Sequence, residues 1–327
     1  MADEEDPVAL RRDNKLTKFP ICDILNIGER KFELKGTISV SKILLMTDSG
    51  CDLGLERASQ YGIKVLPLKY SFDGEHYFLD GIDQTVEEFY AMEKTMEDVP
   101  KTAQISPLEF EEAFEEAYKE GYDTVIYTSL SGKASGTCQN AVMMGNAVMA
   151  EHEGFRVEVI DSLSYSVLYG FAVIEGAKVL KAGGSAEDVI ERIKKVCYSA
   201  NAYFLTDDLT HLKKGGRINA ATFAVANMLD IKPVLVLKDG LVEQGAKLRG
   251  SKNIYKKLVD AAKTMGDFSE GRVFTIHTCV HEKAAFLRNA ISEQFPNIVI
   301  DDAVVGPTIG CHTGPDLFGI VYFAEKF

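Results

Sequence analysis

Short strand-like segments alternate with helical segments, and this alternation constrains the fold more than any other feature of the chain. Strands that alternate with helices form parallel βαβ units. We therefore predict an α/β fold whose first part contains a parallel sheet. The predicted strands are 43–47, 65–70, 124–128 and 157–160, and the helices between them are 107–120 and 137–149.

One helix start is marked strongly. In Ser106-Pro107-Leu108-Glu109, Ser106 can cap the helix and Pro107 suits its first position. Glu109 completes a capping box with Ser106. Apolar residues follow at helical spacing, and Gly121 is a plausible end.

Three predicted strands end in a polar pair: Asp48-Ser49, Thr128-Ser129 and Asp161-Ser162. In open parallel sheets, ligands bind beyond the carboxyl ends of the strands. Hydroxyl and carboxylate groups at several strand ends therefore indicate a binding site at this edge, with Ser49 among its candidates.

The second half of the chain also alternates, and residues 1–41 differ from the rest because they are charged and irregular. We predict an N-terminal extension at 1–41 and two domains at 42–165 and 166–327, with any boundary falling within 163–200. The predicted helices are 165–180, a helix capped near 185, 220–228, 251–265 and 281–295, and the strands are 203–206, 234–238, 273–278, 298–305 and 319–323.

The net charge of −13 disfavours nucleic acid and anionic membrane surfaces as partners. No apolar run approaches the roughly 20 residues of a membrane span, so no stable membrane insertion is expected. Residues 1–6 are acidic, unlike a signal peptide. The six cysteines form no CxxC pair, which favours reduced thiols and a cytoplasmic protein.

Two glycine-containing motifs are candidates for ligand binding. The loop 131–137 fails the Walker pattern but places Ser135, Gly136 and Thr137 at a helix start, where free amides favour an anion. Plain helix capping by Ser135 is the alternative. His312 lies among glycines and prolines, which predicts a constrained loop, and a surface-turn histidine is the alternative.

A basic patch contrasts with the acidic chain. Residues 209–257 contain ten Lys or Arg and three Asp or Glu. A solvated face is one interpretation, and a docking surface is the other. The patch includes Lys213, Lys214, Arg217, Lys247, Arg249 and Lys252.

The histidines show no metal-ligand spacing, so no metal site is predicted.

Taken together, six motifs resemble the DegV family, the fatty-acid-binding subunits of bacterial fatty acid kinase. Each motif is weak, but six in the family's order are specific, and they span about residues 42–327. They are Asp48-Ser49, Thr102-x-Gln104-x-Ser106-Pro107, Ser135-Gly136-Thr137 with Gln139, Asp161-Ser162, Lys213-Lys214-Gly215-Gly216-Arg217-Ile218 and Gly310-Cys311-His312-Thr313-Gly314-Pro315.

The resemblance implies an N-terminal Rossmann-like domain with a parallel sheet, a C-terminal α/β domain with a mixed sheet, and one fatty acid buried between them. It implies that Thr102 and Ser135 hold the carboxylate with His312 close by. A separate ATP-dependent kinase subunit would phosphorylate that carboxylate for phospholipid metabolism, and Arg217 and Arg249, with Lys213 and Lys214, would dock it. No cofactor and no catalytic residue are expected.

Two other classes of function remain open. A serine-dependent acyl hydrolase would use Ser135 or Ser49 with His312 as base, although the chain has no GxSxG elbow. A purely structural or interaction protein would lack a cavity large and apolar enough for a lipid.

Overall fold

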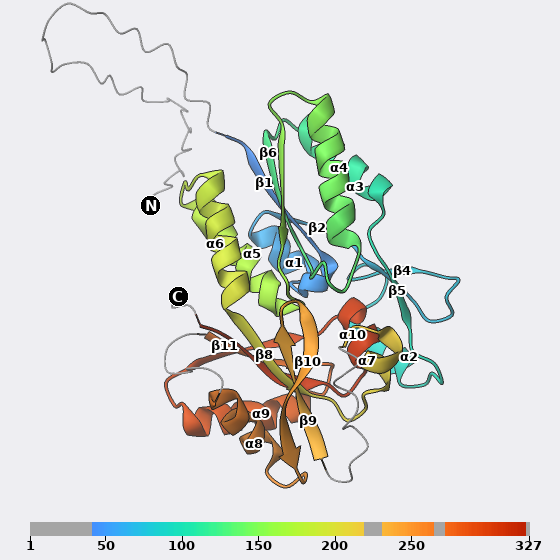
Figure 1. The fold of residues 1–327 in the computed structure, drawn as a ribbon, viewed down its shortest axis with the longest axis vertical. Helices are drawn as coiled ribbons and strands as arrows, with labels where there is room; N and C mark the ends of the chain where they lie inside the picture. Colours follow the sequence, from blue (N-terminus) through green and yellow to red (C-terminus); the bar gives the residue numbers. More distant parts are fainter. Residues whose placement is uncertain (1–40, 219–230, 265–271, 325–327) are drawn as a thin grey trace, which may run out of the picture. The chain divides into compact units, whose positions relative to one another are not determined.

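The computed structural model of the protein describes residues 41–218, 231–264 and 272–324 (Figure 1). Its first layer, sheet A, is a parallel sheet with strand order β2-β1-β6-β7. Every residue of β6 is buried, as expected for a central strand covered on both faces. The strands are β1 (Ile43–Asp48), β2 (Ile63–Leu66), β6 (Thr124–Ser129) and β7 (Arg156–Asp161).

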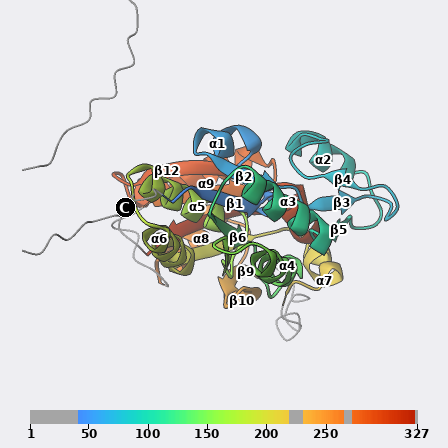
Figure 2. The same ribbon diagram turned by 90° about the horizontal axis from the view of Figure 1, so that it is seen from above.

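Helices cover both faces of sheet A (Figures 1 and 2). One face carries α3 (Pro107–Lys119) and α4 (Thr137–Glu151), and the other carries α5 (Val167–Lys181) and α6 (Ala186–Ser199). The predicted capping box is confirmed, because Ser106 Oγ accepts from Glu109 N and the Glu109 carboxylate accepts from Ser106 N. The short α1 (Leu55–Gln60) joins β1 to β2.

A second, six-stranded sheet, sheet C, has the order β10-β9-β8-β13-β11-β12, and only β11 and β12 are parallel. The mixed sheet of the second half is thereby confirmed. Two helices pack on its outer face, α8 (Ile254–Lys263) and α9 (His281–Gln294). The strands are β8 (Ala200–Leu205), β9 (Ile231–Lys238), β10 (Leu241–Arg249), β11 (Arg272–His277), β12 (Val299–Val304) and β13 (Phe318–Phe323).

Helix α5 lies between the two sheets. Eleven of its 15 residues are buried, so it is apolar on nearly every side. Phe171 on α5 contacts Phe274 and Phe323 of sheet C with ring centroids 5.4 and 4.9 Å away, while the same helix packs on β1. The domain boundary at residues 165 and 166 stays a prediction, because this helix shares its packing between both sheets.

The strand predicted at 65–70 is wrong as a single element. β2 ends at Leu66 and β3 (Lys69–Ser71) begins after Pro67, in a different sheet. Proline cannot donate to a ladder, so the chain leaves sheet A there. A small antiparallel sheet, sheet B, contains β3 with β4 (Phe78–Leu79) and β5 (Lys101–Ala103), and α2 (Val86–Glu93) follows β4 in sequence.

His312 lies on a helix and not on the predicted loop. Pro307 occupies the first turn of α10 (Pro307–Thr313), and Gly314 ends the helix with φ of 79°. Proline is well suited to a first helical position, and glycine to a positive φ at the end. The helices α1, α2 and α7 (Thr210–Gly215) and the strands β4, β5 and β10 were not predicted.

Most other predicted elements are found within one to four residues of their predicted bounds. The helix predicted at 220–228 lies outside the described residues. Across the described parts of the chain, no helix combines the length and apolarity needed to cross a membrane.

Candidate functional site

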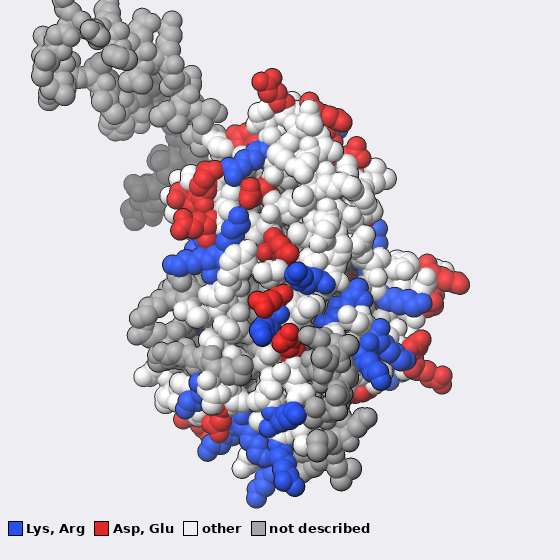
Figure 3. Space-filling model, in the orientation of Figure 1, with Lys and Arg blue, Asp and Glu red and all other residues white. Residues whose placement is uncertain are grey.

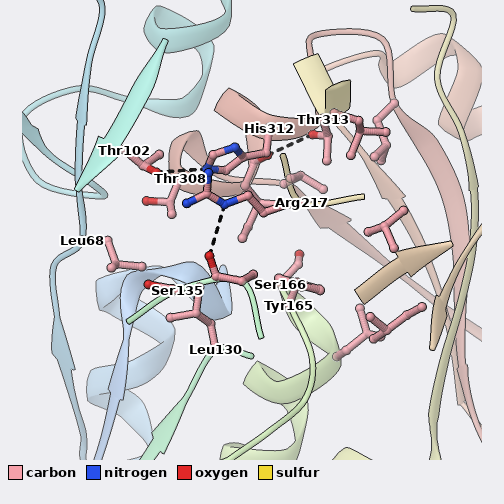
Figure 4. Close-up of a pocket in the computed structure, with 18 of the residues that line it drawn as sticks. Leu68, Thr102, Leu130, Ser135, Tyr165, Ser166, Arg217, Thr308, His312 and Thr313 are labelled. Atoms are coloured by element: carbon pink, nitrogen blue, oxygen red, sulfur yellow. Dashed lines mark hydrogen bonds between the residues drawn. The ribbon is translucent and has the colours of Figure 1, made fainter. Parts of the chain in front are cut away.

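A cavity of about 400 Å³ lies between the carboxyl ends of sheet A, the inner face of sheet C and helix α10 (Figure 4). Its volume falls in the range of small-molecule sites. More than half of its lining residues are apolar, and they come from both halves of the chain. These are Leu68, Ala103, Leu130, Ala134, Leu168, Ala202, Phe204, Leu212, Leu237, Val242, Ile276, Val305, Ile309 and Leu317.

The position of this cavity follows from the strand order of sheet A. After β1 the chain forms β2 on one side, and β6 then pairs on the other side of β1. Ligands bind at such switch points, outside the carboxyl ends of the strands. The loop after β6 lines the cavity with Leu130, Ala134, Ser135 and Gly136, as the sequence predicted for this edge.

Thr102 and His312 meet in the cavity although 210 positions separate them. Thr102 Oγ1 lies 3.0 Å from His312 Nε2. Burial, together with the charges of Arg217 and His211, lowers the pKa of His312 to about 4. The imidazole is therefore neutral near pH 7, and within the part of the chain that the structure describes its Nδ1 atom has no hydrogen-bond partner.

Gly215 explains why a glycine pair precedes Arg217. A Cβ atom at Gly215 would lie 2.5 Å from His312 Nδ1. Only glycine allows α7 to pass this close to the imidazole. Gly216 then ends α7 with φ of 67°, and the chain turns there just before Arg217, which lines the cavity.

Ser135, Gly136 and Thr137 form the start of α4, and two of the three line the cavity. Ser135 Oγ lies 2.8 Å from Thr137 Oγ1 and accepts a hydrogen bond from Thr137 N at 3.3 Å. Thr137 is buried beneath Ser135 and does not line the cavity. A Cβ on Gly136 would overlap Gln104 Oε1, so a larger residue here would displace the Gln104 side chain from its place in the lining.

Arg217 lines the cavity with Ser135 and His312, whereas the other three basic candidates do not. Its Nε donates to Ala134 O at 3.1 Å, and its Nη1 donates to Gly215 O. Among the described residues, no carboxylate forms an ion pair with it. Figure 4 shows Arg217 beside His312, with the loop of Ser135 facing it.

The remaining basic candidates lie on the surface. Lys213 and Lys214 are exposed on α7, and Lys214 Nζ lies 2.7 Å from Asp98 Oδ1. Arg249 is exposed at the end of β10. Figure 3 shows Lys and Arg side chains gathered over the region of α7 and of the β9–β10 hairpin.

Ser49 lies outside the lining of the cavity. Its Oγ donates to Asp80 Oδ2 at 3.1 Å and accepts from Leu68 N at 2.9 Å. Asp80 also accepts from Thr308 Oγ1 at 2.5 Å, and burial raises the pKa of Asp80 to about 6. Ser49 is therefore linked through Asp80 to a cavity residue on α10.

Sequence reasoning missed several polar residues of the lining. Thr313 belongs to the same motif as His312, and Thr308 lies just before that motif. Tyr165 and Ser166 follow closely on Asp161-Ser162, so the neighbours of both motifs were the signal that could have identified these residues. Gln104 lies in the motif that contains Thr102.

A buried pair lies behind the cavity. His211 Nε2 on α7 is 3.1 Å from Glu93 Oε1 on α2. The Glu93 side chain is 1% exposed, and burial raises its pKa. This contact ties α7, which lines the cavity through Leu212, to α2.

Comparisons with known proteins agree with this fold. The sequence model of the DegV family matches residues 42–325. A DegV domain-containing protein of Caldanaerobacter subterraneus subsp. tengcongensis, TTE1491, is 34% identical over 288 residues, covering 88% of this chain and 100% of that protein.

Solved structures share the architecture. A DegV family protein from Thermus thermophilus, described for its fatty acid binding, matches with a TM-score of 0.78 at 28% identity, covering 87% of this chain and 100% of that one. A stearic acid-binding protein from Eubacterium ventriosum matches with a TM-score of 0.75 at 25% identity, covering 87% and 98%. With a family match over nearly the whole described region and the same two-sheet architecture, the chain belongs to the DegV family.

Proposed function

We propose that the cavity binds one long-chain fatty acid and that the protein is a carrier. The observation that carries this proposal is an apolar cavity whose wall also holds Thr102, Ser135, Arg217 and His312. Two similar structures are described as fatty-acid-binding, which supports the same ligand class. The acyl chain would lie against the leucines and Phe204, and the carboxylate would lie near His312.

The hydrophobic contribution is sufficient for tight binding. Each buried methylene contributes about 0.8 kcal/mol, so about 15 methylenes contribute on the order of 12 kcal/mol before the costs of association. The carboxylate then needs donors more than a full countercharge. Hydroxyl groups of Thr102 and Ser135 and the first turn of α4 can supply them.

Arg217 is assigned here to the carboxylate in place of the docking role expected from sequence. It lines the cavity, and no described carboxylate pairs with its guanidinium. A guanidinium of this kind is suited to a ligand carboxylate. The charge of Arg217 also lowers the pKa of His312 and so helps to keep its imidazole neutral. A ligand carboxylate between them would therefore lie beside the cationic guanidinium of Arg217 and the neutral imidazole of His312.

Presentation to a kinase subunit is the second part of the proposal. A carboxylate oxygen would attack the γ-phosphorus of ATP, giving acyl phosphate and ADP. Exposed Lys213, Lys214 and Arg249 would offset repulsion between ATP and the carboxylate and guide docking. Five described cysteines are free, which fits the cytoplasm proposed as its location.

A hydrolase is the weaker alternative. Nucleophilic catalysis requires a serine hydroxyl within hydrogen-bond reach of its base. Ser135 Oγ is bonded to Thr137, Ser49 Oγ is bonded to Asp80, and His312 Nε2 is bonded to Thr102. Turnover of acyl esters that disappears in Ser135→Ala would favour this alternative.

Mass spectrometry tests the carrier directly. Purified protein, denatured and extracted, should release about one equivalent of fatty acid, or the empty protein should take up added fatty acid. Arg217→Gln should retain less ligand than the unmodified protein, while remaining folded by circular dichroism. A folded protein that neither releases nor takes up fatty acid contradicts the proposal.

A further inference from the structure

Three metal-ligating side chains from two distant segments meet outside the cavity. Glu87 lies in the first turn of α2, and Cys279 and His281 lie where β11 connects to α9. One carboxylate oxygen, the Sγ atom and one imidazole nitrogen all lie within 4.8 Å of one another. Glu87 and His281 are exposed and Cys279 is half-buried, so an ion can reach them from solvent.

These side chains are not committed to other partners. Within the described ranges, none of the three forms a hydrogen bond or an ion pair, and His281 has only a ring contact with His277 at 4.7 Å. The backbone of Cys279 adds a second observation, because its φ is 57°. Residues other than glycine adopt this region at a cost, and such strain gathers at functional positions.

A second cluster of similar composition provides a contrast. Glu115, Glu151 and His152 also lie close together. There, however, His152 Nε2 is 2.5 Å from Glu115 Oε1, Glu115 also pairs with Lys119 at 3.4 Å, and the imidazole stacks on Tyr118. Those groups already satisfy one another, so this second cluster needs no ion.

We propose that Glu87, Cys279 and His281 bind a divalent transition-metal ion of the Zn²⁺ class. Thiolate, imidazole and carboxylate are the donors that Zn²⁺ takes in proteins, and three protein ligands leave a fourth position for water. The thiol releases its proton when the sulfur binds the ion, so binding weakens as pH falls. Motif spacing could not reveal this site, because Glu87 lies 192 positions before Cys279 in the sequence.

The bound ion would tie α2 to the C-terminal part of the chain. Helix α2 packs on α10 through Phe89 and Tyr90, and Tyr90 OH donates to Val305 O at 2.8 Å. Because α10 carries Thr308 and His312, the metal would brace the wall of the cavity from behind. The metal site itself does not depend on which ligand the cavity takes.

Titration of the full chain with Co²⁺, after treatment with a chelator, tests the site. We expect one ion per chain and a thiolate-to-cobalt charge-transfer band. Cys279→Ser should abolish the band and weaken Zn²⁺ binding, measured against a chromophoric chelator, by more than about a hundredfold. Glu87→Gln, at an exposed position where folding is safe, should weaken binding at least about tenfold but keep the band.

Two matched controls separate this site from others. His152→Gln removes the imidazole of the second cluster, and Cys22→Ser removes a thiol outside the described residues. Both should bind one ion as tightly as the unmodified chain. Unchanged binding in Cys279→Ser, or loss of the site in either control, overturns the assignment.

Hydrogen exchange tests whether α2 is tied down. Zn²⁺ should slow exchange of α2 amides in the unmodified protein and leave them unchanged in Glu87→Gln. Zn²⁺ binding without slower exchange in α2 would remove Glu87 from the ligand set.

Discussion

The carboxylates at the carboxyl end of sheet A differ from the titratable groups on the helices across the cavity, although the hydroxyls of Thr128 and Ser129 at the end of β6 have no hydrogen-bond partner within the described residues. Asp48 accepts from Tyr169 OH at 2.6 Å, Tyr127 OH at 2.8 Å and Leu130 N at 3.0 Å. Asp161 accepts from Gly132 N and Leu163 N. Across the cavity, and counting only the described residues, His312 Nδ1, His211 Nδ1 and Glu93 Oε2 are buried with no hydrogen-bond partner, while Glu93 Oε1 pairs with His211 Nε2.

The difference distinguishes residues that hold the loops in place from residues that face the cavity. The strand-end carboxylates accept hydrogen bonds from the backbone of the loops, and the loop after β6 places Leu130 and Ser135 in the cavity wall. The groups on α2, α7 and α10 are left with unused hydrogen-bonding capacity in a buried place, which is costly unless something uses it. The carboxylates at the strand ends thus mark the edge of the cavity without lining it.

The largest expected effect comes from removing a supporting carboxylate. Asp48→Ala leaves two tyrosine hydroxyls and two backbone amides without their acceptor. Each buried unsatisfied donor costs about 1–3 kcal/mol, so we expect a loss near 4 kcal/mol in the free energy of unfolding by urea, partly offset because burial of this carboxylate is itself unfavourable. Asp98→Ala, an exposed control, should unfold almost as the unmodified chain does. A loss below about 1 kcal/mol for Asp48→Ala would show that the loops hold without it.

The second prediction concerns pH and the opposite wall. The folded pKa of His312 is about 4 and its ordinary value is 6.5, so the unfolded state binds the proton first as pH falls. The neutral ring therefore contributes full stability above pH 6.5 and loses it toward pH 4. Relative to His312→Gln, the unmodified protein should lose roughly 3 kcal/mol of unfolding free energy across that window. Urea unfolding at several pH values measures it, and a flat difference between the two proteins would mean that His312 is accessible to protons in the folded state.

The third prediction tests the loop that sheet A supports. Ser135→Ala should weaken fatty acid binding roughly ten- to a hundredfold, because a hydrogen bond to a charged group contributes about 1.5–3 kcal/mol. Isothermal titration with a fatty acid measures the dissociation constant. Ser106→Ala is the matched control, since it removes a helix cap away from the cavity and should lower stability without changing affinity. Equal affinities for all three proteins would exclude Ser135 from the site.

The smallest expected effect on lipid binding is that of Arg249→Ala. Arg249 is exposed at the end of β10 and does not line the cavity, so the variant should keep its fatty acid. It should, however, be phosphorylated more slowly by a fatty acid kinase subunit, and the rate for the unmodified pair should fall as salt rises. Normal phosphorylation would leave the surface basic residues as a solvated face, and loss of lipid would place Arg249 at the site.

The sequence by itself determined the elements whose signals are local. The capping box at Ser106, the alternation of strands and helices, and the glycine-containing loop before α4 act over a few residues, and the corresponding elements form where they were expected. Helix α10 escaped this reasoning because its glycines and prolines resemble those of a loop. Pro67 was likewise not taken as the end of a strand, so β2 and β3, which belong to different sheets, were predicted as one strand.

Only the tertiary structure decided which of the marked residues meet. Thr102 and His312 become partners because sheet B and α10 pack together, and Arg217 enters the cavity while Lys213 and Lys214 remain outside because the chain turns at Gly216 between them. Glu87 reaches Cys279 and His281 only through the packing of α2 against the C-terminal part. Capping and periodicity depend on neighbours along the chain, whereas these contacts depend on how buried surfaces far apart in sequence fit one another.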